Sequence, residues 1–203
     1  MNLDNNTESN KLENNELSKM KLAVLISGSG TNLQSLINAE KSNYFQSEIA
    51  LVISNRKSAY GLTRAQEAGI KTMVIKSDDE LVDVLLENEI DMVVLAGYLS
   101  IFSPKVIETF ENRIINIHPS LLPAYGGHGM YGLNVHKKVF EDKAKTTGAT
   151  VHYVTNVIDV GPIILQKHIN IDYDVIKSPE ELQQAVLVIE HQIFKEAIKK
   201  LEE

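Results

Sequence analysis

The sequence predicts an α/β fold, with a single doubly wound domain, a mostly parallel central sheet, an antiparallel edge hairpin and a long C-terminal helix. From residue 21 to about residue 119, short apolar runs alternate with stretches of helical periodicity, which is typical of βαβ units. A length of 203 residues suits one medium domain, and 43% hydrophobic with 23% charged residues is an ordinary globular balance.

The first part of the chain predicts the parallel strands and the helices that connect them. Residues 21–28 (KLAVLISG) are an apolar run that ends in glycine, as buried strands often do. Comparable runs predict further strands at residues 49–54, 72–75, 91–98 and 113–119. The intervening patterns predict helices over residues 32–40 and 62–68, a third that begins near Asp78 and Asp79, and a fourth that Ser103 and Pro104 open.

After Pro119 the pattern changes. Residues 121–134 hold four glycines and a proline, which is too loose for the centre of a sheet and predicts a functional loop. A short helix is expected over residues 135–140, followed by strands over 147–154 and 161–171 that form the edge hairpin. Ser178 and Pro179 then begin the long final helix, whose apolar residues recur at helical spacing.

Composition limits both the extent of the folded domain and the classes of function. Residues 1–19 are polar and are expected to be a disordered tail, so the predicted domain covers residues 20–203. The sequence has no cysteine, which excludes disulfide scaffolds and cysteine nucleophiles, and its formal net charge of −7 argues against a broad nucleic-acid surface. Without a signal peptide or a membrane-length apolar run, a cytoplasmic protein with small-molecule partners is expected, with neither nucleic acid nor membrane as partner.

A small-residue loop follows the first predicted strand. Residues 27–32 (SGSGTN) can turn sharply and direct backbone N–H groups at an anion where the next helix begins. A dinucleotide fingerprint would need glycine in place of Leu33 and an acidic residue in place of Asn55 or Arg56. The loop therefore favours a phosphate monoester, with an ordinary tight turn as the alternative.

Two polar residues close the fifth predicted strand. Strand alternation places Asn116 and His118 on the same side, at the end of the strand where open α/β sheets have their sites. An amide donor beside an imidazole could polarise a carbonyl and hold its oxyanion. A buried, hydrogen-bonded pair without catalytic role is the equally weighted alternative.

Two acidic residues stand out later in the chain. Asp159 lies between apolar residues and before Gly161. If its carboxylate lay near His118, it would favour the imidazolium form of that histidine. An ordinary turn aspartate is the simpler interpretation. Glu190 borders the apolar stripe of the final helix and could bind a ligand amine, with a solvated helix acid as the default.

Other common site patterns are absent from the sequence. His128, His136, His152 and His168 lack a metal-ligand spacing, so no metal is predicted. The nucleophile elbow GxSxG and the phosphate-binding GxxxxGK[ST] motif do not occur either, which argues against two common hydrolase classes.

Taken together, several segments resemble the folate-dependent phosphoribosylglycinamide formyltransferase (glycinamide ribonucleotide transformylase) family of purine biosynthesis. The resemblance runs from about Met20 to the C-terminus. The segments are ISGSGTNLQ (26–34), VVLAGY (93–98), INIHPSLLPAY (115–125), GATVHYV (148–154) and DVGPII (159–164). It implies a transferase of one-carbon metabolism with a Rossmann-like fold, which moves a formyl group from 10-formyltetrahydrofolate to the amine of 5-phosphoribosylglycinamide through a tetrahedral intermediate.

The resemblance also implies roles for residues at matching positions. Asn116, His118 and Asp159 fall at catalytic positions, and Gly30, Thr31, Asn32 and Glu190 at positions that bind the ribonucleotide substrate. The positions that line the folate pocket are Leu99, Ser100, Ile101, Phe102, Asn116, Thr155, Asn156, Val157 and Ile158. Ser100 departs from the pattern, because many relatives carry arginine there, and the stretch from Lys76 to Asp91 is shorter than in many relatives.

Three rival functions share part of this pattern. Methionyl-tRNA formyltransferase needs a further C-terminal domain and a basic surface for tRNA, whereas this chain is acidic. Formyltetrahydrofolate hydrolase usually carries an N-terminal regulatory domain, which a short polar segment cannot form. A phosphate-ligand sensor would use the loop without chemistry, and Asn116, His118 and Asp159 argue against it.

Overall fold

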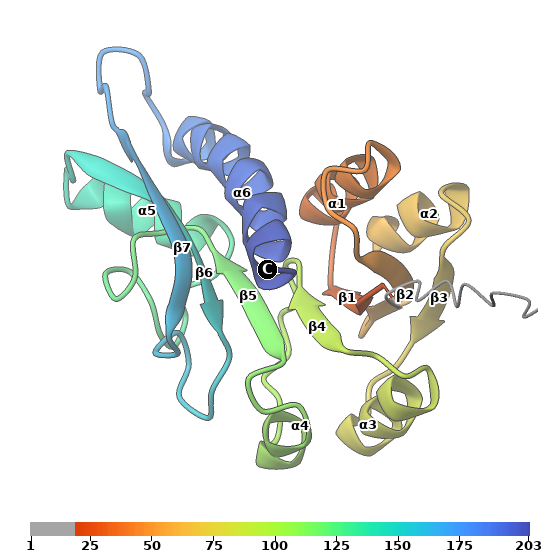
Figure 1. The fold of residues 1–203 in the computed structure, drawn as a ribbon. Coiled ribbons are helices and arrows are strands. Elements are labelled where there is room, and N and C mark those ends of the chain that lie inside the picture. Colours follow the sequence, from red (N-terminus) through yellow and green to blue (C-terminus); the bar gives the residue numbers. More distant parts are fainter. Residues whose placement is uncertain (1–18) are drawn as a thin grey trace, which may run out of the picture.

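The chain alternates strands and helices from Lys21 onward in a computed structural model that describes residues 19–203 (Figure 1). The predicted tail over residues 1–19 lies outside the described residues, apart from Lys19. The elements are β1 (Lys21–Ile26), α1 (Thr31–Lys41), β2 (Glu48–Ser54), α2 (Tyr60–Glu67), β3 (Lys71–Val74), α3 (Asp78–Glu87), β4 (Met92–Leu95), α4 (Pro104–Thr109), β5 (Ile114–His118), α5 (Leu133–Glu141), β6 (Thr146–Tyr153), β7 (Ile163–Asn170) and α6 (Pro179–Leu201).

One seven-stranded sheet runs through the described residues, in the order β3-β2-β1-β4-β5-β6-β7. The pairs among β1 to β5 are parallel, whereas β6 pairs antiparallel with both β5 and β7. This arrangement confirms the predicted α/β class, the antiparallel edge hairpin and the long final helix. The order of the strands reverses at β1, so the chain leaves a crevice at the carboxyl ends of β1 and β4.

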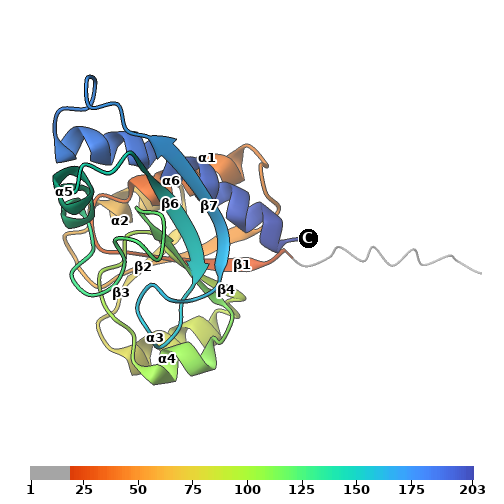
Figure 2. The same cartoon turned by 90° about the vertical axis from the view of Figure 1, so that its left-hand side faces the viewer.

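Helices cover both faces of the sheet. In Figure 2, α3 and α4 lie together on one side of the sheet, whereas α1 and α6 lie on the other. Two buried apolar clusters correspond to these layers, one beneath α1, α2, α5 and α6 and one beneath α3 and α4. The strands between them are buried on both faces, which is why they read as continuous apolar runs in the sequence.

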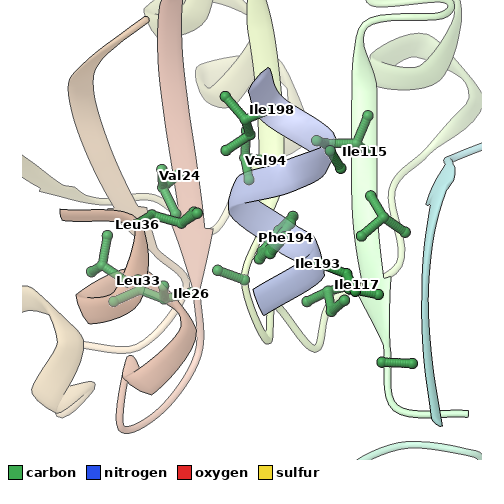
Figure 3. Close-up of a cluster of buried hydrophobic side chains, with 14 of the residues drawn as sticks. Val24, Ile26, Leu33, Leu36, Val94, Ile115, Ile117, Ile193, Phe194 and Ile198 are labelled. Atoms are coloured by element: carbon green, nitrogen blue, oxygen red, sulfur yellow. The ribbon is translucent and has the colours of Figure 1, made fainter. Parts of the chain in front are cut away.

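Helix α6 is the main support of the first layer. Figure 3 shows Ile193, Phe194 and Ile198 of this helix between β5 on one side and β1 with α1 on the other, with Val94 of β4 against Ile198. Ser178 caps the helix as expected, because its side chain accepts a hydrogen bond from the Glu181 N–H. The helix is therefore fixed at its start and along its buried face.

One predicted strand is shorter than the sequence suggests. Residues 91–98 were expected to be extended, but β4 ends at Leu95. Gly97 adopts a left-handed backbone with φ of 79°, and its carbonyl accepts the Ser27 N–H. The apolar run therefore turns out of the sheet two residues after Leu95, and the segment that follows enters the crevice.

Candidate active site

A cleft of about 680 Å³ opens at the carboxyl ends of β1, β4 and β5. Its volume lies in the range of small-molecule sites, and its place at the strand-order reversal is where open α/β sheets bind ligands. All residues that the sequence places in a site line this one cleft: Gly30, Thr31, Asn32, Leu99, Ser100, Ile101, Phe102, Asn116, His118, Thr155, Asn156, Val157, Ile158, Asp159 and Glu190.

The glycine-rich loop forms one end of the cleft. Gly30 has φ of 71° and packs so closely on the α2 backbone that an added Cβ would lie 2.6 Å from the Gly61 Cα. It precedes Thr31, the first residue of α1, and no side chain caps this helix. The first N–H groups of α1 therefore remain available to a ligand, as an anion site requires.

Asn32 and Glu190 meet across the cleft wall. The Asn32 amide donates a 2.8 Å hydrogen bond to the Glu190 carboxylate, and Glu190 is only 7% exposed. Burial raises the pKa of Glu190, while the bond from Asn32 opposes that rise. The default interpretation of Glu190 as a solvated helix acid is thus wrong, because α6 turns this residue into the cleft.

Asn116 is oriented by a histidine on the neighbouring strand. It lies opposite His152 in the β5–β6 register, and its Nδ2 is 3.2 Å from His152 Nε2. His152 Nδ1 lies 2.9 Å from the Tyr153 carbonyl, which can only accept, so Nδ1 carries the proton and Nε2 accepts from Asn116. Burial lowers the pKa of His152 and favours this neutral form.

His152 was considered in the sequence only for metal spacing, and its contact with Asn116 was missed. The relevant feature is the pairing of adjacent strands, which places one residue of the sixth predicted strand opposite each residue of the fifth. The register that selects His152 depends on the long loop between β5 and β6, so the sequence alone did not supply it.

His118 and Asp159 come together although 41 positions separate their numbers in the chain. His118 Nε2 lies 2.8 Å from the Tyr125 carbonyl and donates to it, while Nδ1 is 3.6 Å from Asp159 Oδ2. Their side chains are 5% and 10% exposed. The second carboxylate oxygen of Asp159 is 3.6 Å from His152 Nε2, so this carboxylate lies between two imidazoles.

Both separations of 3.6 Å exceed a direct hydrogen bond and are too short for a water to lie between the two atoms, so a water that contacts both groups must sit beside the pair. The Asp159 carboxylate is held by the Gly127 N–H, which donates to Oδ2 at 2.9 Å. The arrangement can place a charged or water-bridged donor beside the Asn116 amide.

Close backbone approaches hold Asp159 in position. Asp159 has φ of 58°, a left-handed conformation that aspartate tolerates better than most residues. A Cβ on Gly161 would lie 1.8 Å from the Tyr153 carbonyl oxygen, and one on Gly126 would lie 3.2 Å from the Asp159 Cβ. Glycine at both positions therefore allows the β6–β7 loop to return to β5.

Large apolar side chains form a further wall of the cleft. Ile101 and Val157 are 70% and 60% exposed, and Leu99 is 45% exposed. Large apolar side chains exposed together at a cleft indicate a surface that binds a flat or apolar ligand. Within residues 19–203, no three metal-ligating side chains converge to hold an ion.

Fold and side chains together define a class: an α/β protein with a buried imidazole–carboxylate pair in a crevice of small-molecule size at the strand ends. The sequence pattern of the formyl transferase family matches residues 20–198. This chain belongs to the formyl transferase family.

Similar proteins within this class are known. The chain is 41% identical over 188 residues to the phosphoribosylglycinamide formyltransferase of Haemophilus influenzae, covering 88% of this chain and 85% of that one. It is 36% identical over 190 residues to the chloroplastic enzyme of Arabidopsis thaliana, covering 89% of this chain. It spans 64% and 61% of the lengths of the plant relatives from Arabidopsis thaliana and Vigna unguiculata.

A solved structure of glycinamide ribonucleotide transformylase 1 from Symbiobacterium toebii superimposes with a TM-score of 0.82 at 38% identity. The match covers 89% of this chain and 86% of that one. Within residues 19–203, no helix is both long and apolar enough to cross a membrane.

Proposed function

We propose that this protein transfers a formyl group from 10-formyltetrahydrofolate to the amine of 5-phosphoribosylglycinamide, in de novo purine biosynthesis. The observation that carries the proposal is the meeting of Asn116, His118 and Asp159 in the cleft that also holds the glycine-rich loop. Relatives named for this activity, at 36% to 41% identity, support the same assignment.

The two substrates fit different parts of the cleft. The phosphate of the ribonucleotide would lie on the N–H groups at the start of α1, next to Gly30, and its amine end near Glu190. The apolar wall at Leu99–Phe102 and Thr155–Ile158 would take the folate ring. This placement brings the formyl carbon to Asn116 and His118, between the two binding regions.

In the reaction, the substrate amine attacks the formyl carbon and the carbonyl oxygen becomes an oxyanion. The N–H of Asn116 that is not used for His152 donates to this oxygen, and protonated His118 supplies a second, charged donor. The bond between the formyl carbon and the folate nitrogen then breaks and the oxyanion becomes a carbonyl again. The folate nitrogen takes one proton and the attacking amine loses one, so no net proton is consumed. We assign both transfers to His118, which gives its proton to the folate nitrogen through a water that Asp159 orients and recovers one from the amine through the same water.

Formyl transfer with purified protein tests the proposal. Removing one donor to an oxyanion typically lowers kcat on the order of 10²–10³-fold, which is the loss expected for His118→Ala. Asp159→Asn should also abolish most turnover, because Asp159 orients the water that relays the His118 proton. His168→Ala, at an exposed position on β7, is the matched control and should keep wild-type turnover. Thermal unfolding of each variant checks that the fold survives.

The assay also separates the rival functions. Transfer that requires the ribonucleotide amine supports the proposal. Release of formate without that acceptor indicates a hydrolase, and binding without turnover indicates a sensor; each of these outcomes contradicts the proposal. Near-wild-type turnover in both His118→Ala and Asp159→Asn would rule out the mechanism. The cytoplasmic location remains a prediction, which fractionation of cells with a tagged copy would test.

A further inference from the structure

Arg56 is an exposed residue directly after β2, at the edge of the cleft. Among the lysines and arginines of residues 19–203, only Arg56 lines this cleft. Its backbone is fixed, because the N–H donates to the Ser54 hydroxyl at 3.1 Å and the carbonyl accepts the Ala59 N–H. Its guanidinium makes no hydrogen bond or ion pair with any residue between 19 and 203.

The negative charge of the protein makes the Arg56 cation important for the binding of anions. The sequence has a formal net charge of −7, and two of the carboxyl groups counted in it, those of Asp159 and Glu190, line the cleft. Both substrates of the proposed reaction are anions, one with a phosphate and one with glutamate carboxylates. A net negative protein repels such ligands unless a local positive group offsets the field.

A hydrogen-bonded chain connects the position of Arg56 to the apolar wall. The Ser27 hydroxyl accepts the Leu99 N–H at 2.8 Å and donates to Asn55 Oδ1 at 2.8 Å. The Asn55 amide in turn donates to the Ser100 hydroxyl at 2.6 Å. Residue 56 therefore follows a residue that is bonded directly to the segment at 99–102.

We propose that Arg56 binds an oxyanion of an incoming substrate at the open end of the cleft and so determines affinity for anionic substrates. This inference rests on the proposed function. The Arg56 guanidinium presents two parallel N–H donors, which match the oxygens of a carboxylate or a phosphate. The ribonucleotide phosphate already has the N–H groups of α1, whereas the Leu99–Phe102 side holds no other cation, so we expect the folate carboxylates to depend on Arg56 most.

Equilibrium binding and kinetics with the full chain test this inference. Arg56→Ala should raise the Kd and KM for a folate carrying glutamate about tenfold and leave kcat near wild type, because Arg56 is not among the groups assigned to the reacting carbonyl. Arg56→Lys should recover part of the loss. Lys57→Ala removes a neighbouring exposed cation that does not line the cleft, and should behave as wild type. The difference between wild type and Arg56→Ala should shrink at high salt.

Separate titrations with the ribonucleotide and with a folate monoglutamate identify the anion. A selective rise in the Kd for either ligand supports the inference and names its partner. If Arg56→Ala matches Lys57→Ala with both ligands while the wild type transfers formyl, the inference about Arg56 fails and the proposed function stands. If the wild type binds neither ligand, both fail.

Discussion

Acidification should destabilise this protein in part through His136, a buried histidine of α5. His136 lies on α5 against the apolar layer beneath α6, lines the cleft and is only 1% exposed. Burial, with a smaller contribution from the nearby charge of His118, lowers the pKa of His136 from 6.5 to about 4. Within residues 19–203 no group accepts from or donates to its Nδ1. The folded protein therefore holds this imidazole neutral at pH values where an unfolded chain would protonate it.

The direction of the effect follows from proton uptake. Between pH 6.5 and about 4 the unfolded chain binds more protons at His136 than the folded one, so stability falls as the pH is lowered through this range. Each pKa unit corresponds to about 1.36 kcal/mol, so the contribution that is lost amounts to about 3 kcal/mol. This is a substantial part of the ~5–15 kcal/mol by which domains are usually stable.

Urea unfolding at a series of pH values from 7 to 4 measures this contribution. His136→Gln keeps a polar side chain that does not titrate, so its unfolding free energy should fall by about 3 kcal/mol less than that of the wild type over the same range. His168→Gln, at an exposed position on β7, should follow the wild type. Parallel curves for wild type and His136→Gln would show that burial of His136 does not control acid stability.

Three further substitutions test the packing and the site. Gly161→Ala should lower both the melting temperature and turnover. The added Cβ would lie 1.8 Å from the Tyr153 carbonyl oxygen and would displace the loop that carries Asp159. An unchanged melting temperature in calorimetry together with unchanged turnover would contradict this. Phe194→Ala should cost about 3–5 kcal/mol in urea unfolding, because the ring is fully buried, and a loss below 1 kcal/mol would refute the packing argument. Glu190→Gln should gain stability on the wild type as the pH rises above 4.5, because burial raises the pKa of Glu190 and makes its ionisation unfavourable in the folded state. Equal slopes in pH-dependent unfolding would speak against it.

Much of the fold could be predicted because apolar periodicity and helix-start signals agree. The buried strands of the parallel sheet show as continuous apolar runs, and Ser178 and Pro179 mark the start of α6. The end of β4 could not be predicted, because Ala96 and Tyr98 prolong the apolar run and Gly97 between them is compatible with a strand end or with a strand interior. A backbone turn at Gly97, fixed by a bond from Ser27, decides that boundary.

In the candidate site, too, local features could be predicted from the sequence and tertiary contacts could not. Alternation along β5 predicted that Asn116 and His118 share a side, since that is a local property of a strand. The contact of Asp159 with His118 depends on a loop in which Gly126 and Gly161 permit close packing, and such tertiary packing has no local signal. The burial of Glu190 likewise depends on how α6 docks on the sheet.

Antiparallel pairing at one edge of a parallel sheet explains how the reacting groups are oriented. Because β6 runs against β5, His152 lies opposite Asn116, and its Nδ1 is committed to the Tyr153 carbonyl. The lone pair on Nε2 then fixes which end of the Asn116 amide is the donor, a choice that an isolated asparagine would leave open. The same hairpin carries Asp159 back to His118. A wholly parallel sheet would need a crossover connection at this point and could supply neither partner so directly.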